Sequence, residues 1–275
     1  MEVAYLKQNN IRTISLRQQF AGWLVHAFTA SGAYVGVLAL YAIYQQKFLS
    51  ALWLMLIAIC IDAVDGLFAR MIRIKEAVPK INGELLDNIV DFFNYTIVPA
   101  FFLLVTQLVS TTWEFPCVVI VVLSSAYQFT QEDAKTSDHF FKGFPSYWNI
   151  AVFYLFFWQM DKITNLGIIL LLAILSFVPI KYIYPSRLDY LTKSAILRIA
   201  MLLATIGWGF ATAGLLWIYP ASNKVLVSIS MGYMILYVAI SLYRTWIPLS
   251  HIPRWKKITE LKNLRGKWDM PDNLG

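Results

Sequence analysis

Eight long apolar segments constrain the fold of this chain more than any other feature of its sequence. A helix needs roughly 17–25 apolar residues to cross a bilayer, and each segment is long enough. Backbone polar groups in lipid must bond internally, and no alternating pattern suggests a barrel, so we predict helices. We therefore expect an all-α polytopic membrane protein with about eight transmembrane helices. The expected spans are 20–45, 48–71, 84–110, 113–130, 144–160, 163–184, 195–217 and 222–244.

Composition agrees with a membrane protein and excludes an ordinary soluble domain. Of the 275 residues, 59% are hydrophobic and only 14% are charged, and the mean hydropathy is +0.59. The net charge of +7 is spread over several loops. We therefore expect anionic membrane lipid as a partner and no nucleic acid. Residues 1–19 are predicted to be a cytoplasmic segment with amphipathic character, and 245–275 a basic cytoplasmic tail.

The distribution of basic residues predicts the orientation in the membrane. If the N-terminus is inside, all but three of the 23 Lys and Arg residues lie on the cytoplasmic side. The exceptions are Lys47, Lys162 and Lys224. Cytoplasmic loops of membrane proteins carry such an excess, so both termini are predicted to be cytoplasmic.

The first span carries a stripe of small residues. Thr29, Gly32 and Gly36 recur at helical spacing, which predicts that another helix approaches closely there. His26 lies near the inner end of the same span. A single histidine there is more often a hydrogen-bonded interfacial residue than a ligand, and we assign it no role.

Four aspartates interrupt the second and third apolar segments. Asp62 and Asp65 are three residues apart and Asp87 and Asp91 four apart, so on helices each pair projects from one face. The connector between the two segments is long enough to reverse the chain. Four carboxylates that meet near a membrane surface would repel one another unless cations lay between them. Hard divalent cations prefer oxygen ligands and commonly accompany phosphate, so a metal site is predicted.

The motif around these aspartates is D-x2-D-G-x2-A-R-x12-G-x3-D-x3-D. It resembles the signature of the CDP-alcohol phosphatidyltransferases, which exchange an alcohol for CMP on CDP-diacylglycerol or make an equivalent transfer. The gap from Arg70 to Gly83 is longer than usual, and in this the chain resembles bacterial phosphatidylcholine synthases. The resemblance implies a six-helix catalytic core, with 20–244 as the catalytic domain. The alternative is a cation-coupled transporter, but its pathway acids need no Gly, Ala and Arg at fixed offsets, and no internal repeat is visible.

The resemblance also implies roles for the motif residues. Asp62, Asp65 and Asp87 would hold the first of two divalent cations, Mn2+ or Mg2+. Asp91 would contact the second cation and act as the catalytic base that takes the proton from the alcohol. The residues expected to bind CDP-diacylglycerol are Gly66, Ala69, Arg70 and Gly83.

Two of the nucleotide-lipid predictions have a simpler alternative. Gly83 also fits a helix start capped by Asn82, and both interpretations can hold together. The stretch 179–187, P-I-K-Y-I-Y-P-S-R, offers further phosphate ligands because cationic forks and hydroxyl groups bind phosphate. Ordinary positive-inside charge explains its basic residues equally well. The candidates there are Lys181, Ser186 and Arg187.

The loop at 127–149 is the predicted acceptor site. Its Gly143-Phe144-Pro145 turn resembles the corresponding region of phosphatidylserine and phosphatidylcholine synthases. Where the serine enzymes carry basic residues this chain has acidic ones, which favours a cation. A quaternary ammonium also needs π faces. The choline-binding candidates are therefore Tyr127, Glu132, Asp133, Tyr147, Trp148 and Asn149.

Together these features predict an enzyme that transfers the phosphatidyl group of CDP-diacylglycerol to choline and releases CMP. Acceptors left open are serine, inositol phosphate and glycerol phosphate. We expect a homodimer in the bacterial inner membrane, with the active site on the cytoplasmic side.

Overall fold

The computed structural model describes residues 15–136, 140–185, 188, 191–192 and 194–247. It confirms the all-α polytopic membrane fold. Among the described residues, six helical stretches are long and apolar enough to cross a membrane, and the third of them is built from α4, the π-helical turn η1 and α5. These elements are α1 (Leu16–Tyr44), α2 (Phe48–Ile72), α4 (Gly83–Phe92), η1 (Phe93–Ile97), α5 (Val98–Thr106), α6 (Thr111–Thr130), α9 (Ala195–Ile218) and α10 (Lys224–Trp246).

Two of the eight predicted spans form shorter helices than expected. Helix α7 covers Trp148–Trp158 and α8 covers Lys162–Leu175, in place of 144–160 and 163–184. Proline explains both differences, because it disfavours helix in the residue before it and lacks an N–H donor. Pro145 precedes a positive-φ residue just ahead of α7, and Pro179 follows the end of α8.

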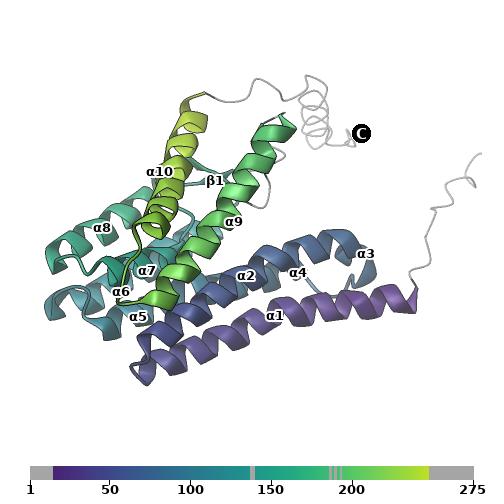
Figure 1. Cartoon of the computed structure of the whole chain (residues 1–275). Helices are drawn as coiled ribbons and strands as arrows, with labels where there is room; N and C mark the ends of the chain where they lie inside the picture. Colours follow the sequence, from purple (N-terminus) through teal and green to yellow (C-terminus); the bar gives the residue numbers. More distant parts are fainter. Residues whose placement is uncertain (1–14, 137–139, 186–187, 189–190, 193, 248–275) are drawn as a thin grey trace, which may run out of the picture.

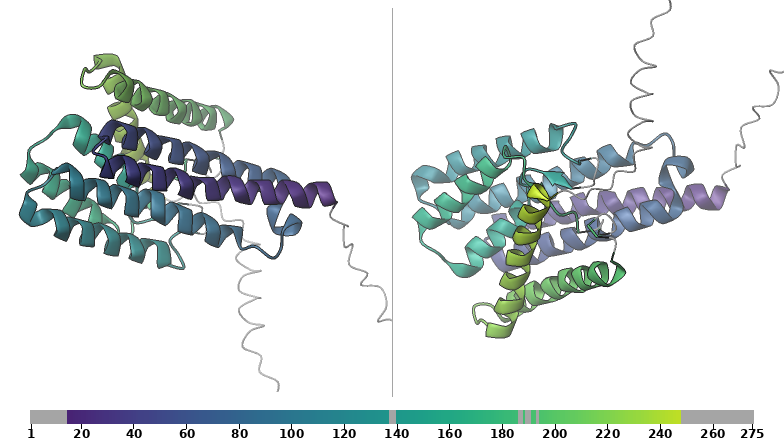
Figure 2. Two further views of the ribbon diagram at one scale, coloured as in Figure 1. Left: turned by 90° about the horizontal axis from the view of Figure 1, so that it is seen from below. Right: turned by 90° about the horizontal axis from the view of Figure 1, so that it is seen from above.

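The helices form a bundle with an inclined hairpin on one flank. Helices α1 and α2 run side by side, and the one-turn helix α3 (Ile74–Ala77) closes the end at which α1 begins (Figure 1). Helices α9 and α10 form the hairpin, which is inclined to α1 and α2; both views of Figure 2 show it on one side of the bundle. The best-buried large side chains include Phe102 of α5 and Trp148 of α7, which mark the core between α5, α6 and α7.

The small-residue stripe of α1 does bring another helix close. A Cβ atom added at Gly32 would come within 2.9 Å of Val90 Cγ1, and one at Gly36 would collide with Asn94 and Phe93. The Asn94 side-chain amide donates a hydrogen bond of 3.0 Å to the Gly32 carbonyl. The predicted contact is therefore made by α4, which carries the second aspartate pair, and by η1, which follows it.

A π-helical turn interrupts the third span directly after Asp91. Pro99 has no N–H to bond the carbonyl of Tyr95, four residues earlier, and its ring crowds that carbonyl. A wider turn relieves this crowding, and π turns often occur at functional sites. Residues Asn94, Tyr95 and Thr96 of the turn are all buried.

A two-stranded antiparallel ladder joins the segments before α7 and after α8. Strand β1 (Phe141–Lys142) pairs with β2 (Lys181–Tyr182), and Phe141 lies opposite Tyr182. Side chains alternate along an extended chain. Accordingly Ile183 is buried (1% exposed) in the protein core, whereas Tyr182 and Tyr184 line a cavity. Non-helical backbone beside membrane helices is tolerated where it lines such a cavity.

Candidate active site

The two motif halves bring three aspartates together. Asp62 comes from α2 and Asp87 and Asp91 from α4, and one carboxylate oxygen of each lies within 4.8 Å of the others. Oxygen ligands at roughly 2.0–2.6 Å from one hard cation would be separated by up to about 4–5 Å. The donor type and the separations therefore both fit a divalent cation.

Asp65 lies beside this cluster rather than in it. Its side chain is buried (5% exposed), and it lines a small cavity of about 10 Å³ together with Thr29 of α1. Asp91 lines the same small cavity. Four aspartates therefore meet at the contact of α1, α2 and α4. Three of them are close enough for one carboxylate oxygen of each to bind the same cation.

The local sequence explains where α4, the helix that carries Asp87 and Asp91, begins. Asn82 caps α4 by accepting a 3.1 Å hydrogen bond from the Leu85 amide, so the capping interpretation of Gly83 is confirmed. A Cβ atom on Gly83 would come within 2.8 Å of the His26 ring. His26 is buried, and its Nε2 has no partner among the described residues.

Tyr95 of the π turn holds one of the carboxylates. Its hydroxyl group donates a 2.7 Å hydrogen bond to Asp62 Oδ2, and its ring is buried (6% exposed). Residues that bond a metal ligand fix its orientation. The wider turn thus aims a side chain four residues after Asp91 at an aspartate of the other helix.

A cavity of about 680 Å³ opens beside the aspartates. Asp62, Asp65 and Asp87 line it, together with residues of α7, α8, α9, α10 and the segments around β1 and β2. Apart from Thr205, the rest of its wall is apolar or aromatic, and the described lining contains no Lys, Arg or His. The part that runs between α7 and α8 is lined by Leu155, Ile168 and Leu172.

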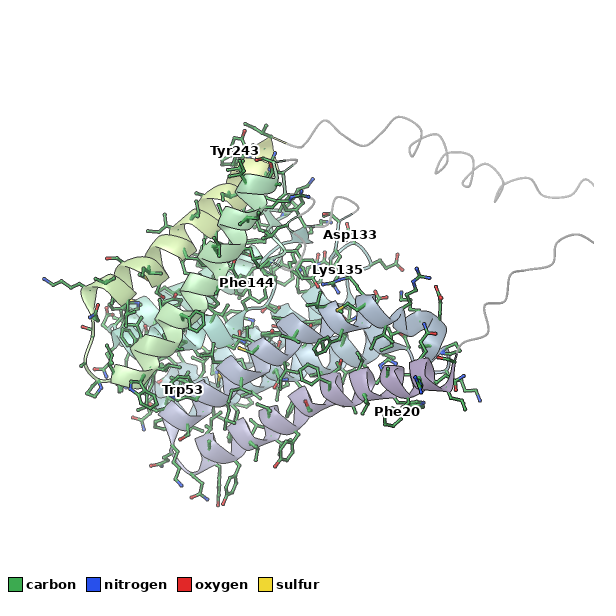
Figure 3. The ribbon with its side chains drawn as sticks, turned by 45° about the vertical axis from the view of Figure 1, so that its right-hand side comes forward. Phe20, Trp53, Asp133, Lys135, Phe144 and Tyr243 are labelled. Atoms are coloured by element: carbon green, nitrogen blue, oxygen red, sulfur yellow. The ribbon has the colours of Figure 1, made fainter. Side chains whose placement is uncertain are left out.

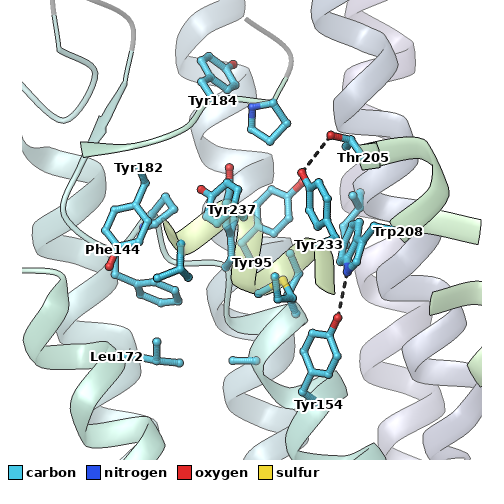
Figure 4. Close-up of a pocket in the computed structure, with 18 of the residues that line it drawn as sticks. Tyr95, Phe144, Tyr154, Leu172, Tyr182, Tyr184, Thr205, Trp208, Tyr233 and Tyr237 are labelled. Carbon is cyan, nitrogen blue, oxygen red and sulfur yellow. Dashed lines mark hydrogen bonds between the residues drawn. The ribbon is translucent and has the colours of Figure 1, made fainter. Parts of the chain in front are cut away.

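Hydrogen bonds fix several of the aromatic rings (Figure 4). Trp208 Nε1 donates to the Tyr154 hydroxyl group at 2.9 Å, which in turn lies 2.6 Å from Ser230 Oγ, so α7, α9 and α10 are linked. The Tyr233 hydroxyl group lies 3.0 Å from Thr205 Oγ1, and Tyr237 donates to the Ile183 carbonyl at 3.0 Å. These rings are therefore held by the protein before any ligand binds.

Lys135 is a cation within electrostatic range of the aspartate cluster. Lys135, in the loop after α6, interacts electrostatically with Asp62, Asp87 and Asp91. Figure 3 shows it with Asp133 away from Trp53, which lies near the beginning of α2. Lys135 was not predicted as a site residue. The signal available in the sequence was its position in the loop, two residues after the acidic pair Glu132 and Asp133.

The residues predicted for CDP-diacylglycerol lie in two parts of the chain: the aspartate motif and the stretch 179–187. Gly66 lines the cavity, and an added Cβ there would lie 3.3 Å from Arg70 Nη1. Ala69 is half-buried one position before Arg70. The Lys181 ammonium lies instead 5.9 Å from the centre of the Phe140 ring. Ser186 and Arg187 lie outside the described residues.

Of the six residues predicted for choline, Tyr147 is the one that lines the cavity. Trp148 is fully buried and donates a 2.9 Å hydrogen bond to Ser125, and Asn149 faces a separate small cavity between α2, α7 and α9. The other three belong to the outer surface: Tyr127 stacks on Phe177 at 4.6 Å, Glu132 is exposed, and Asp133 accepts a 2.6 Å hydrogen bond from Lys142, which lowers the pKa of Asp133.

Several cavity residues were not foreseen from the sequence. Tyr182 and Tyr184 alternate along an extended stretch, a period-two pattern visible in K-Y-I-Y. Tyr233 and Tyr237 lie on the face of α10 that also buries Ser230 and Ser241. These polar residues recur at helical spacing within an apolar span, and that pattern could have predicted that this face of α10 lines a cavity.

Comparisons with known proteins agree with this geometry. The family model described as CDP-alcohol phosphatidyltransferase matches residues 24–252. A protein of Legionella pneumophila named phosphatidylcholine synthase is 50% identical over 236 residues, which cover 86% of this chain and 92% of that protein. Proteins of the same name from Legionella bozemanae and Borreliella burgdorferi are 49% and 43% identical, over 78% and 63% of this chain and 100% and 74% of their own lengths.

Proposed function

The chain belongs to the CDP-alcohol phosphatidyltransferase family, and from that premise we propose that it transfers the phosphatidyl group of CDP-diacylglycerol to choline and releases CMP. One observation carries the choice of acceptor. The cavity beside the aspartates is aromatic, and its described lining holds carboxylates but no basic side chain. Serine, inositol phosphate and glycerol phosphate each carry an anionic group that would need a cationic partner, whereas choline does not. The names of the relatives agree with this choice.

The aspartates divide the work of the reaction. Asp62 and Asp87, with Asp65 beside them, would hold a divalent cation, and Asp91 would bind a second. Two such cations, Mn2+ or Mg2+, would neutralise the diphosphate and stabilise the leaving CMP. Asp91 then takes the proton from the choline hydroxyl group as it attacks the phosphorus. The Tyr95 hydroxyl group keeps the Asp62 carboxylate oriented toward Asp87 and Asp91.

In this proposal CDP-diacylglycerol binds beside the aspartate cluster, next to the other residues of the motif. Gly66 leaves space at the cavity wall and Ala69 adds little bulk beside it, whereas Gly83 lets α4 lie close to His26 of α1. Arg70 and Lys135 would supply positive charge for the diphosphate, and the electrostatic interaction of Lys135 with three aspartates supports this role. The apolar wall of α7 and α8 suits an acyl chain of the lipid.

Two wider features belong to the same proposal. The enzyme works as a homodimer in the bacterial inner membrane, with its active site toward the cytoplasm. The basic residues Arg70, Arg73 and Lys75 lie at the end of the bundle where the aspartate-bearing helices are connected, and Lys47 begins α2 at the opposite end. This distribution supports the orientation through the positive-inside rule.

A choline-transfer assay tests the function. The purified protein in detergent is given CDP-diacylglycerol, labelled choline and Mn2+. We expect labelled phosphatidylcholine and CMP in equal amounts, and loss of both with a chelator. Asp62→Asn and Asp87→Asn should each abolish transfer because a ligand charge is removed at constant size.

Asp161→Asn is the matched control. Asp161 caps α8 by accepting from the Ile163 and Thr164 amides, and asparagine caps equally well, so activity should be retained. Full activity of the Asp62 or Asp87 variant in chelated buffer would contradict the metal site. Incorporation of serine in place of choline would contradict the acceptor.

A further inference from the structure

Aromatic rings from four separate segments surround the part of the cavity next to Asp62. Tyr95 of η1 contacts Tyr147, which precedes α7, with ring centres 6.0 Å apart. Tyr147 and Tyr184, which follows β2, both contact the Phe141 ring, with ring centres 6.2 and 4.6 Å from it. Tyr237 of α10 donates a 3.0 Å hydrogen bond to the carbonyl of Ile183, the residue before Tyr184. All four rings line the cavity (Figure 4 labels three of them).

We propose that Tyr95, Tyr147, Tyr184 and Tyr237 form an aromatic cage for the quaternary ammonium group of the acceptor. The inference rests on the proposed function and specifies where its substrate binds. A cation within about 6 Å of a ring centre is attracted to the ring face, and the attraction is strongest where water is excluded. A quaternary ammonium cannot donate hydrogen bonds, so ring faces are its most favourable neutral partners.

The length of choline decides which rings can take part. Its hydroxyl oxygen and its nitrogen are separated by three bonds of about 1.5 Å, so they lie at most about 4 Å apart. When the hydroxyl group attacks at the aspartate cluster, the ammonium must therefore lie next to that cluster. Tyr95 satisfies this condition because its hydroxyl group bonds Asp62 at 2.7 Å. Tyr147 follows, since its ring contacts Tyr95.

The charges around the cavity favour the same ligand. Asp62, Asp65 and Asp87 contribute negative charge to the lining, and the described lining contributes no basic residue. Lys142 is outside the lining and is paired with Asp133 at 2.6 Å. An anionic acceptor would find no cationic side chain in this described lining, whereas a quaternary ammonium needs only the ring faces.

Selection of the acceptor is thereby assigned to the four tyrosine rings, and no longer to the acidic residues of the loop at 127–149. Glu132 and Asp133 are exposed, and neither lines the cavity. Exposed carboxylates bind a cation weakly because water screens them. The two sites make opposite predictions for the same kinetic measurement, so one experiment separates them.

The test measures the Michaelis constants for choline and for CDP-diacylglycerol in ring variants. Tyr147→Leu and Tyr237→Leu should each raise the choline KM about ten- to thirtyfold and leave the CDP-diacylglycerol KM within about twofold, as expected for a desolvated cation–π contact. Tyr147→Phe keeps the ring face, and its choline KM should stay within about threefold of the wild type. Tyr127→Leu is the matched control, because Tyr127 stacks on Phe177 outside the cavity.

A second measurement needs no variant and so does not depend on folding. Tetramethylammonium, which keeps the cationic head group of choline, and 3,3-dimethylbutanol, the uncharged isostere of choline, are compared as competitors of choline on the wild-type protein. The cage predicts inhibition by tetramethylammonium at a concentration at least tenfold lower. Equal inhibition by the two compounds would overturn the cage, since shape alone would then explain binding.

The outcomes separate this inference from the proposed function. If the wild type does not transfer choline at all, the proposed function and the cage both fail. If the wild type uses choline but the leucine variants keep the wild-type choline KM, only the cage fails. A rise in choline KM in the Glu132→Gln, Asp133→Asn double variant, with unchanged leucine variants, would return the selection to the acidic loop.

Discussion

The hydrogen bond from Tyr95 to Asp62 gives the sharpest test of how the metal site is organised. Tyr95→Phe removes one oxygen atom and keeps the buried ring, including its contact with Tyr147. At 2.7 Å the bond has the length of a charge-assisted O–H···O⁻ contact. Such bonds contribute about 1.5–3 kcal/mol, which corresponds to roughly a ten- to hundredfold effect on an equilibrium.

The loss should appear in the metal dependence. Without its donor, Asp62 is free to rotate away from Asp87 and Asp91, and loss of such a supporting bond typically costs about 10–100-fold in metal affinity or activity. We therefore expect the Mn2+ concentration that gives half-maximal choline transfer to rise about ten- to hundredfold. The choline KM at saturating Mn2+ should change little, because the ring remains.

Tyr154→Phe is the matched control for this prediction. Tyr154 also lines the cavity, and its hydroxyl group bonds Ser230 and Trp208, so the variant loses comparable bonds away from the aspartates. It should lower the melting temperature without changing the Mn2+ dependence. An unchanged Mn2+ dependence in Tyr95→Phe, or an equal change in both variants, would refute the role assigned to Tyr95.

Three further predictions follow from single contacts. Trp148→Phe should lower the melting temperature, because it removes the bond to Ser125 (about 1 kcal/mol) and leaves a void, while the choline KM stays unchanged. Lys135→Gln should raise the CDP-diacylglycerol KM several-fold, whereas Lys142→Gln, which breaks an exposed pair, should not. Gly36→Leu should prevent α1 from packing on η1 and reduce the yield of monodisperse protein in gel filtration, whereas Gly167→Ala, whose added methyl group meets open space, should be tolerated.

Features set by spacing along the chain were predictable. The three- and four-residue intervals put each aspartate pair on one helical face, and helical geometry is local, so the convergence of Asp62, Asp87 and Asp91 needed only a reversal of the chain. The long apolar runs likewise determined the membrane fold, because lipid leaves the backbone no other way to satisfy its polar groups.

The acceptor cavity was decided by tertiary structure. A tryptophan ahead of an apolar run has the same local sequence whether its ring faces lipid, a ligand or the core, and Trp148 proved to be in the core. Tyr95 reaches Asp62 through a π turn, and Tyr184 reaches the cavity through a two-residue ladder with β1. Tyr237 comes from the last helix. Contacts between segments so distant in the chain depend on how helices cross and strands pair, and neither is encoded in the residues next to each ring.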